Sequence, residues 1–110
     1  MYNISDKTKK DIIKHATLCY PYESCGFIID DKYYPQINIA DSPIRDFKIA
    51  DRDYIKYHGK IDAVVHSHIN CEFASGADFR QQACMDIPWL IFNINEFGEL
   101  INIVELSKEI

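Results

Sequence analysis

The feature that most constrains how this chain can fold is the order of its hydrophobic patterns. Short apolar runs of strand length stand between segments whose apolar residues recur at helical spacing. The expected helices span 6–19, 51–59 and 75–86, and the expected strands span 24–30, 33–40, 44–50, 61–68, 88–94 and 100–106. This mixed order predicts an α/β or mixed α+β fold, with one central mixed β-sheet flanked by helices.

Individual residues mark where several of these elements begin or lie. Ser5 or Asp6 is the expected N-cap of the first helix, and Asp51 is expected to cap the second. Pro35 lacks the N–H group that a sheet ladder needs, so it favours an edge position for the strand at 33–40.

The composition indicates an ordinary globular domain that spans residues 1–110. Of the 110 residues, 47% are hydrophobic and 13% are aromatic, which suits one buried core rather than a disordered chain. No apolar run is long enough to cross a membrane, and the N-terminal sequence lacks the apolar stretch of a signal peptide. A cytoplasmic protein is therefore expected. The net charge of −5, without a dense basic cluster, argues against a nucleic-acid partner.

The four cysteines are expected to be free thiols. Cys19, Cys25, Cys71 and Cys84 form no C-x-x-C pair, and the chain carries no secretion signal. Cys25 and Cys84 lie in apolar contexts and are expected to be buried. Cys71 follows closely after His68, which makes it a further candidate as a catalytic thiol.

Two histidines lie at the end of the expected strand 61–68. His66 and His68 are two residues apart, so an extended strand points both imidazoles to one side. Zinc takes nitrogen and oxygen ligands, and Asp78 is a suitable third ligand if the segment after the strand folds back. Simpler explanations exist as well. A polar loop commonly follows a strand, Ser75 suits a helix N-cap, and Asp78 suits the dipole of a helix start.

A hydrolytic zinc site also needs a general base that takes the proton of the metal-bound water. The candidate carboxylates are Glu23, Glu72, Glu96 and Glu99. Glu72 is close to the histidines in sequence but lies on the loop after the strand. Glu23 lies where the chain enters the sheet, and an exposed loop glutamate is the alternative interpretation of this residue.

Four segments together resemble one known family. They are "PYESCGFII", "DFKIADRDYIKY", "AVVHSHINCEFASGADFRQQAC" and "IPWLIFNI", within a resemblance that runs from about residue 12 to 105. These segments resemble the JAMM (MPN-plus) zinc metallopeptidase domain, and within it the branch of bacteriophage tail assembly protein K. The family motif is an upstream glutamate, then H-S/T-H, seven residues, serine, two residues and aspartate. The resemblance implies a JAMM/MPN-like single domain.

The resemblance also implies a role for each motif residue. His66, His68 and Asp78 would be the ligands of Zn²⁺, Glu23 the general acid/base, and Ser75 the group that stabilises the oxyanion. Together they would hydrolyse a peptide or isopeptide bond through a metal-bound water.

Three functions are compatible with this resemblance. The first is a zinc peptidase or amidase that cleaves a tail protein or a cell-wall peptide during phage tail assembly, in the host cytoplasm or in the virion tail. The second is a non-catalytic JAMM-fold subunit that docks other proteins in a tail tip. The third is a bacterial JAMM enzyme that processes a ubiquitin-like or sulfur-carrier protein.

Two departures from the family pattern bear on these expectations. Six residues, rather than seven, separate His68 from Ser75, and Ala74 replaces the proline that usually precedes the serine. A shorter loop costs little, whereas a deletion within the helix would rotate Asp78 by about 100°. Because helical periodicity begins only after Ser75, we expect the shortening to lie in the loop. Members of this branch often carry a cysteine peptidase domain after the JAMM domain, so we expect that activity on another chain or not at all.

Overall fold

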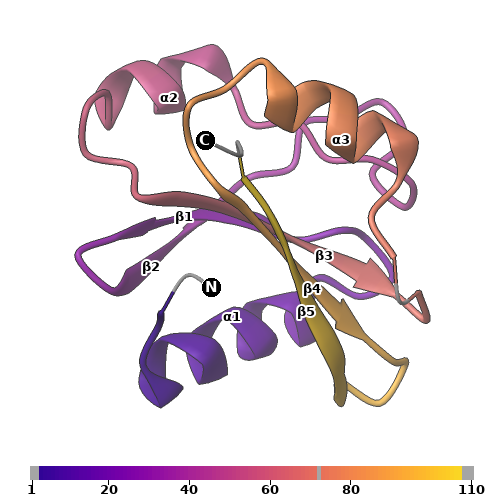
Figure 1. Cartoon of the computed structure of the whole chain (residues 1–110). Coiled ribbons are helices and arrows are strands. Elements are labelled where there is room, and N and C mark those ends of the chain that lie inside the picture. Colours follow the sequence, from indigo (N-terminus) through magenta and orange to yellow (C-terminus); the bar gives the residue numbers. More distant parts are fainter. Residues whose placement is uncertain (1–2, 72, 108–110) are drawn as a thin grey trace.

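A mixed β-sheet runs through the middle of the molecule, and helices cover both of its faces (Figure 1). The computed structural model describes residues 3–71 and 73–107. The helices are α1 (Asp6–Cys19), α2 (Asp51–Lys56) and α3 (Gly76–Ala83). The strands are β1 (Cys25–Ile29), β2 (Lys32–Gln36), β3 (Ala63–Ile69), β4 (Trp89–Ile94) and β5 (Leu100–Leu106). Helix α1 lies on one face, and α2 and α3 lie on the other, so the expected mixed α+β fold is confirmed.

The strand order β2-β1-β3-β4-β5 combines antiparallel and parallel pairs. Strand β1 is antiparallel to both β2 and β3, and β4 is antiparallel to β5. Strands β3 and β4 run parallel, and α3 lies in the crossover that joins them. The chain therefore passes directly from the end of β3, through a short loop, into the start of α3.

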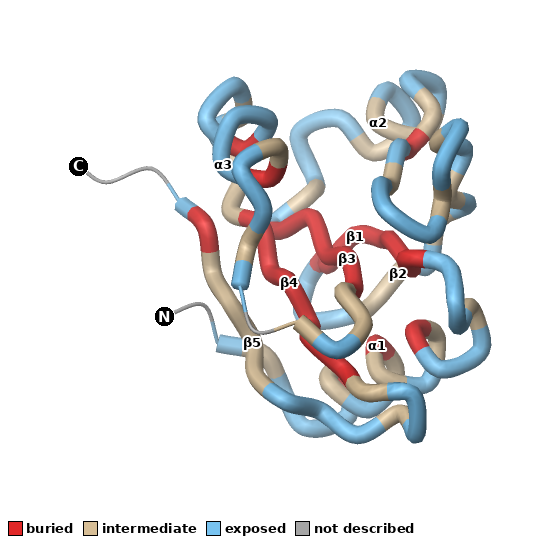
Figure 2. The backbone as a smooth tube through the Cα atoms, turned by 90° about the vertical axis from the view of Figure 1, so that its right-hand side faces the viewer, coloured by how far each residue is buried: buried red, intermediate tan, exposed pale blue. Residues whose placement is uncertain are grey.

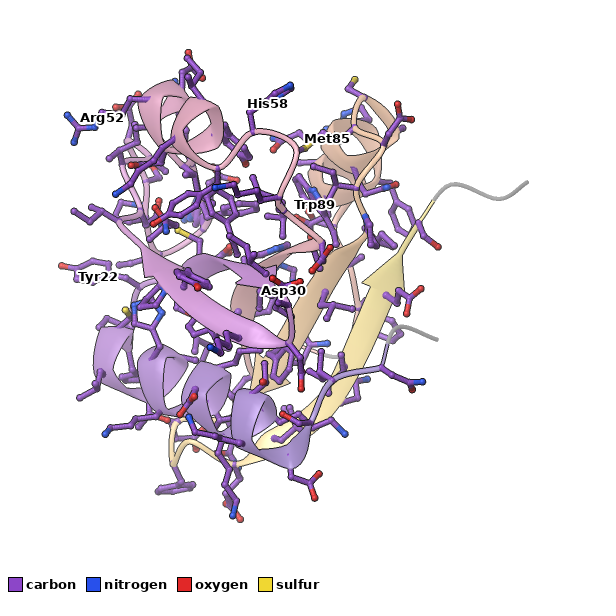
Figure 3. All side chains as sticks on the ribbon, turned by 90° about the vertical axis from the view of Figure 1, so that its left-hand side faces the viewer. Tyr22, Asp30, Arg52, His58, Met85 and Trp89 are labelled. Carbon is purple, nitrogen blue, oxygen red and sulfur yellow. The ribbon has the colours of Figure 1, made fainter. Side chains whose placement is uncertain are left out.

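Alternate residues of the central strands form two hydrophobic cores, one on each face of the sheet. Val64 and Phe27 pack with Trp89, which lies between the sheet and the layer of α2 and α3 (Figure 3). Val65 faces the other way and packs with Ile12 of α1. Strands β1, β3 and β4 are buried along most of their length (Figure 2). This two-sided burial fixes the strand register, because a slip of one residue would exchange the two faces.

Several expected boundaries are confirmed. The helix expected at 6–19 has these bounds, and Ser5 is its N-cap, with the Ser5 hydroxyl oxygen accepting from the Thr8 N–H group at 3.2 Å. Strand β2 contains Pro35 and lies at an edge of the sheet, although it ends at Gln36 and is shorter than expected. The N-cap of α3 is Ser75.

The strand expected at 44–50 is wrong, because this segment forms a turn followed by irregular backbone outside the sheet. Within this segment, Phe47 packs against the core. Asn38 supplies a hydrogen bond that a neighbouring strand would otherwise make, because its side-chain oxygen accepts from the Lys48 N–H group at 3.1 Å. The Ile39 N–H group also donates to the Lys48 carbonyl at 2.9 Å, so these two bonds hold the segment where the sequence pattern suggested a sheet ladder.

Two smaller expectations are also wrong. Ala50, rather than Asp51, is the N-cap of α2, and Asp51 takes the first helical position, where its charge complements the helix dipole. Cys84 is exposed, since it is the residue that follows the last turn of α3, whereas Cys25 is buried as expected. The four cysteines are free thiols. In the part of the chain that the structure describes, every helix is too short or too polar to span a membrane.

Candidate metal centre

The end of β3 carries the two histidines to the face of the sheet that α2 and α3 cover. His66 is completely buried, and its ring stacks on Phe47 with the centroids 4.2 Å apart. Trp89 meets the same imidazole edge-on at 5.5 Å. His68 follows on the same side of the strand, and the two imidazole centroids are 5.0 Å apart. Aromatic packing therefore fixes the orientation of the inner histidine.

The start of α3 brings Asp78 to both histidines. Oδ1 of Asp78 lies 3.0 Å from Nε2 of His66, and Oδ2 lies 3.2 Å from Nε2 of His68. The carboxylate is held in place by a capping box: Oδ2 accepts from the Ser75 N–H group at 2.8 Å, and the Asp78 N–H group donates to the Ser75 hydroxyl at 3.1 Å. Because α3 begins at Gly76, the shortened segment lies in the loop before the helix, as expected, and does not turn Asp78 away.

Glu23 reaches the same point from the opposite direction. Strands β1 and β3 pair Cys25 with His66, and continuing this antiparallel register by two residues places Glu23 across from His68. The Oε2 atom of Glu23 lies 4.0 Å from Nε2 of His68. The backbone of Glu23 is anchored as well, because its carbonyl accepts from the Asn38 side chain at 3.0 Å. Glu23 is 6% exposed, so it is a buried carboxyl group and not an exposed loop glutamate.

These groups form a cluster that can hold a metal ion. Ligand atoms of Glu23, His66 and His68 all lie within 4.8 Å of one another. Neither ring nitrogen of His66 has a hydrogen bond within the described residues, although Nε2 lies 3.0 Å from the Asp78 carboxylate. A buried nitrogen left in this state is costly unless another group binds it. The set of imidazole nitrogens and carboxylate oxygens fits a divalent metal.

The outer ring nitrogen of His68 sets its tautomer. Nδ1 of His68 lies 3.1 Å from the Phe73 carbonyl, which can only accept a hydrogen bond, so Nδ1 carries the proton that it donates. Nε2 then faces Asp78 and Glu23, and its lone pair becomes available to a cation once its own proton has left. A histidine whose second nitrogen is bonded to a carbonyl is the usual arrangement of a metal ligand.

Charge in the cluster is balanced between acids and imidazoles. Burial raises the pKa of Glu23 to about 8, and the charge of His68 offsets this only in part. Burial lowers the pKa of His66, and the contact with Asp78 opposes this only in part. Burial alone would raise the pKa of Asp78, but contacts with the two histidines outweigh it and hold that pKa well below its usual range. Burial also lowers the pKa of His68, yet Asp78 and Glu23 together raise it to about 9. The two carboxylates thus favour a positive charge at the position of the His68 proton, where a cation can replace it.

The remaining candidates from the sequence lie around or away from this cluster. Ser75 is exposed and lines a cavity of about 430 Å³ together with Glu23 and His68. Cys71 lines the same cavity, where its thiol lies 3.3 Å from the Phe73 carbonyl. The exposed turn between β4 and β5 holds the two carboxylates that the sequence left as alternative bases, Glu96 and Glu99. Glu72 lies outside the described residues.

Two residues that support the cluster escaped the sequence analysis. Phe47 stacks on His66, and Asn38 holds the Glu23 backbone while also bonding the 44–50 segment. The alternating pattern of 44–50 could have indicated the inward direction of Phe47. Nothing in the sequence around Asn38 marks its role, because its partners come from distant segments.

Comparison with known proteins gives one relative among curated sequences. The chain is 32% identical over 101 residues to the Tail tip assembly protein K of Escherichia phage N15. It is similar to a phage tail assembly protein. The match covers 86% of this chain and 41% of the phage protein, so the chain spans less than half of its relative's length. No family model matches the chain.

Two solved structures share the fold. Protein DSY2949 from Desulfitobacterium hafniense superposes with a TM-score of 0.66 at 22% identity, covering 97% of this chain and 90% of that protein. A protein from Salinibacter ruber superposes with a TM-score of 0.62 at 16% identity, covering 98% of this chain and 82% of that protein. At these identities the two structures support the fold alone.

Proposed function

We propose that this chain is a zinc-dependent peptidase or amidase of the JAMM type that acts in phage tail assembly. The observation that carries the proposal is the completely buried His66 imidazole, which lacks a hydrogen bond where Glu23, His68 and Asp78 converge. The similarity to a phage tail tip assembly protein supports the biological setting, with tail proteins as partners or substrates.

Three side chains would hold the zinc ion: His66, His68 and Asp78. Two nitrogens and one oxygen are a ligand set that catalytic zinc uses, with a further position left for water or substrate. When bound there, zinc would activate a water molecule and polarise the carbonyl of the scissile bond. Imidazole nitrogens with a carboxylate oxygen suit zinc among other divalent metals, and we choose zinc because the family resemblance implies it.

Glu23 would move the proton. Its carboxylate lies beside His68 on the wall of the cavity that opens toward the cluster, within reach of a water placed there. With a pKa raised to about 8 by burial, Glu23 exchanges a proton near neutral pH in either direction. It would take the proton of the attacking water and then donate it to the nitrogen of the leaving amine.

Ser75 would stabilise the oxyanion. Its hydroxyl oxygen accepts from the Asp78 N–H group, which leaves the hydroxyl hydrogen free to point into the cavity. The capping box fixes this hydroxyl relative to Asp78, so the donor is in position before the substrate arrives.

The same capping box favours the second candidate, a non-catalytic subunit of a tail tip. Ser75 and Asp78 satisfy each other's backbone groups and therefore have a structural role that needs no catalysis. In that case the chain would bind tail proteins without cleaving them. The third candidate, processing of a ubiquitin-like or sulfur-carrier protein, stays a prediction of the family resemblance.

Metal content tests the proposal directly. The protein is purified without a metal-affinity tag and its zinc is measured by elemental analysis, beside a His66→Ala/Asp78→Ala variant and a His58→Ala control, whose histidine is exposed outside the cluster. About one zinc per chain in the wild type and control, lost in the double variant, is expected for a three-ligand site. Zinc-loaded protein is then incubated with purified tail proteins and with wall peptides, and products are identified by mass spectrometry. A folded protein that takes up no added zinc would overturn the proposal.

A further inference from the structure

A second cavity adjoins the candidate metal centre and shares its general base. The cavity of about 430 Å³ contains His68 and Ser75, and a neighbouring cavity of about 480 Å³ lies beside it. Glu23 and Tyr20 line both cavities, so they form the boundary between them. A molecule that reaches across Glu23 from the first cavity therefore enters the second.

The second cavity has an apolar rim. Leu18, Tyr22 and Ile37 line it and are 75%, 50% and 72% exposed, and exposed apolar side chains that gather at one place mark a binding surface. The ring of Tyr22 projects at the edge of the molecule (Figure 3). Leu18 comes from the end of α1, and Ile37 from the loop after β2, so distant segments of the sequence supply the same chemistry to one place.

The second cavity offers little to a charged side chain. Among the described residues that line it, Glu23 is the only acid, and neither lysine nor arginine is present. The first cavity, in contrast, carries Arg45 as well as the polar groups of the cluster. Because His15, Gln36 and Asn38 also line the second cavity, its apolar surface is the part that Leu18, Tyr22 and Ile37 form.

We propose that the second cavity binds a large apolar side chain next to the scissile bond. The substrate class is then a polypeptide segment with an aromatic or branched aliphatic residue at that position. A cell-wall peptide, built mainly from alanine and charged residues, would leave the apolar surface of the second cavity exposed to water. This inference rests on the proposed function and deepens it, because it assigns Leu18 and Ile37 to substrate selection. Burying such a side chain is worth about a 10- to 100-fold preference over alanine.

Peptide cleavage tests the selection. Zinc-loaded protein is incubated with a synthetic library of peptides of randomised sequence, and the cleaved bonds are sequenced by mass spectrometry. Aromatic, leucine or isoleucine residues are expected on one fixed side of the bond. Two matched peptides are then compared, one with phenylalanine and one with alanine at the selected position. The ratio of their kcat/KM values should fall about 10-fold or more in Leu18→Asp and in Ile37→Asp. Ile55→Asp is the control, since Ile55 is 73% exposed on α2 and lines neither cavity.

Binding to the protein without catalysis separates this inference from the proposed function. N-acetyl-phenylalaninamide is titrated into isotope-labelled Glu23→Gln protein, with N-acetyl-alaninamide as the matched probe, and amide shifts are followed by NMR. Shifts around Leu18 and Ile37 with the phenylalanine probe alone, lost in Leu18→Asp, are expected. Cleavage without any apolar preference would overturn this inference and keep the peptidase. Probe binding without cleavage of any peptide would refute the proposed peptidase activity and leave an apolar binding site. The absence of both cleavage and probe binding would refute the proposed function and this inference together.

Discussion

The two faces of β3 bury polar side chains in opposite ways. On one face, Ser67 accepts from the Ser24 N–H group at 2.8 Å and lies 3.0 Å from the Ser24 hydroxyl, so this buried pair satisfies itself. On the other face, His66 is just as buried, but neither of its ring nitrogens has a hydrogen bond within the described residues. An unmet buried polar group costs roughly 1–3 kcal/mol.

This contrast separates structure from function more sharply than burial or polarity alone. The serine pair ties the start of β1 to β3 and needs nothing further. The histidine retains an unmet requirement, and three other titratable groups face the same point: Glu23, His68 and Asp78. A binding site is therefore expected on the second face, and four predictions test the distinction.

The largest effect is expected for the base. Glu23→Gln keeps the shape of the side chain but removes its ability to exchange a proton, so hydrolysis should fall by about 10²–10⁴-fold while zinc stays bound. Rates are measured on any substrate that the wild type cleaves, with zinc content measured on the same samples. Glu99→Gln, in the exposed β4–β5 turn, serves as the control. Loss of zinc in Glu23→Gln would instead make Glu23 a ligand.

A comparison of two helix N-caps separates a catalytic role of Ser75 from its role as a cap. Ser5 and Ser75 each cap a helix through the side-chain oxygen, but Ser5 caps α1, on the face of the sheet opposite the cluster. Replacing either by alanine should cost about 1 kcal/mol in urea denaturation. Only Ser75→Ala should also slow hydrolysis, by about 10²–10³-fold. Equal rates of hydrolysis in the two variants would show that Ser75 acts only as a helix cap.

Zinc should stabilise the folded protein. At a free concentration about 100 times its Kd, a ligand that binds the native state alone adds about 2.7 kcal/mol to the free energy of unfolding. Thermal denaturation with zinc and with a chelator measures this difference in the wild type and in His66→Ala. A shift of the same size in the variant would place the binding elsewhere on the chain.

The smallest effect is expected on the face of β3 where Ser67 and Ser24 bond each other. Ser67→Ala removes the acceptor of the Ser24 N–H group, which should lower the free energy of unfolding by roughly 1–3 kcal/mol. Zinc content per folded molecule should remain unchanged, as measured by elemental analysis beside urea denaturation. A folded Ser67→Ala protein that no longer binds zinc would show that the two faces are coupled.

Much of the candidate site was predictable because its spacing is local. His66 and His68 share a side of any extended strand, and Ser75 and Asp78 share the first turn of any helix that starts between them. The false strand at 44–50 shows where local patterns fail. Alternation alone indicates a strand, but a strand also needs a partner strand, and here the Asn38 side chain and the Ile39 N–H group make the bonds to Lys48.

The sequence by itself determined the mixed order of helices and strands, the edge position of β2 and the pairing of histidines on one side of β3. Periodicity and capping act over a few residues, and the residue types carry them directly. Residue patterns alone left several carboxylates open as the base and only the family resemblance named Glu23, whereas the tertiary structure shows Glu23 beside His68. That position depends on the register of β1 against β3, which brings together residues more than forty positions apart in the chain. Long-range burial on both faces of the sheet sets this register, and no short segment of sequence contains it.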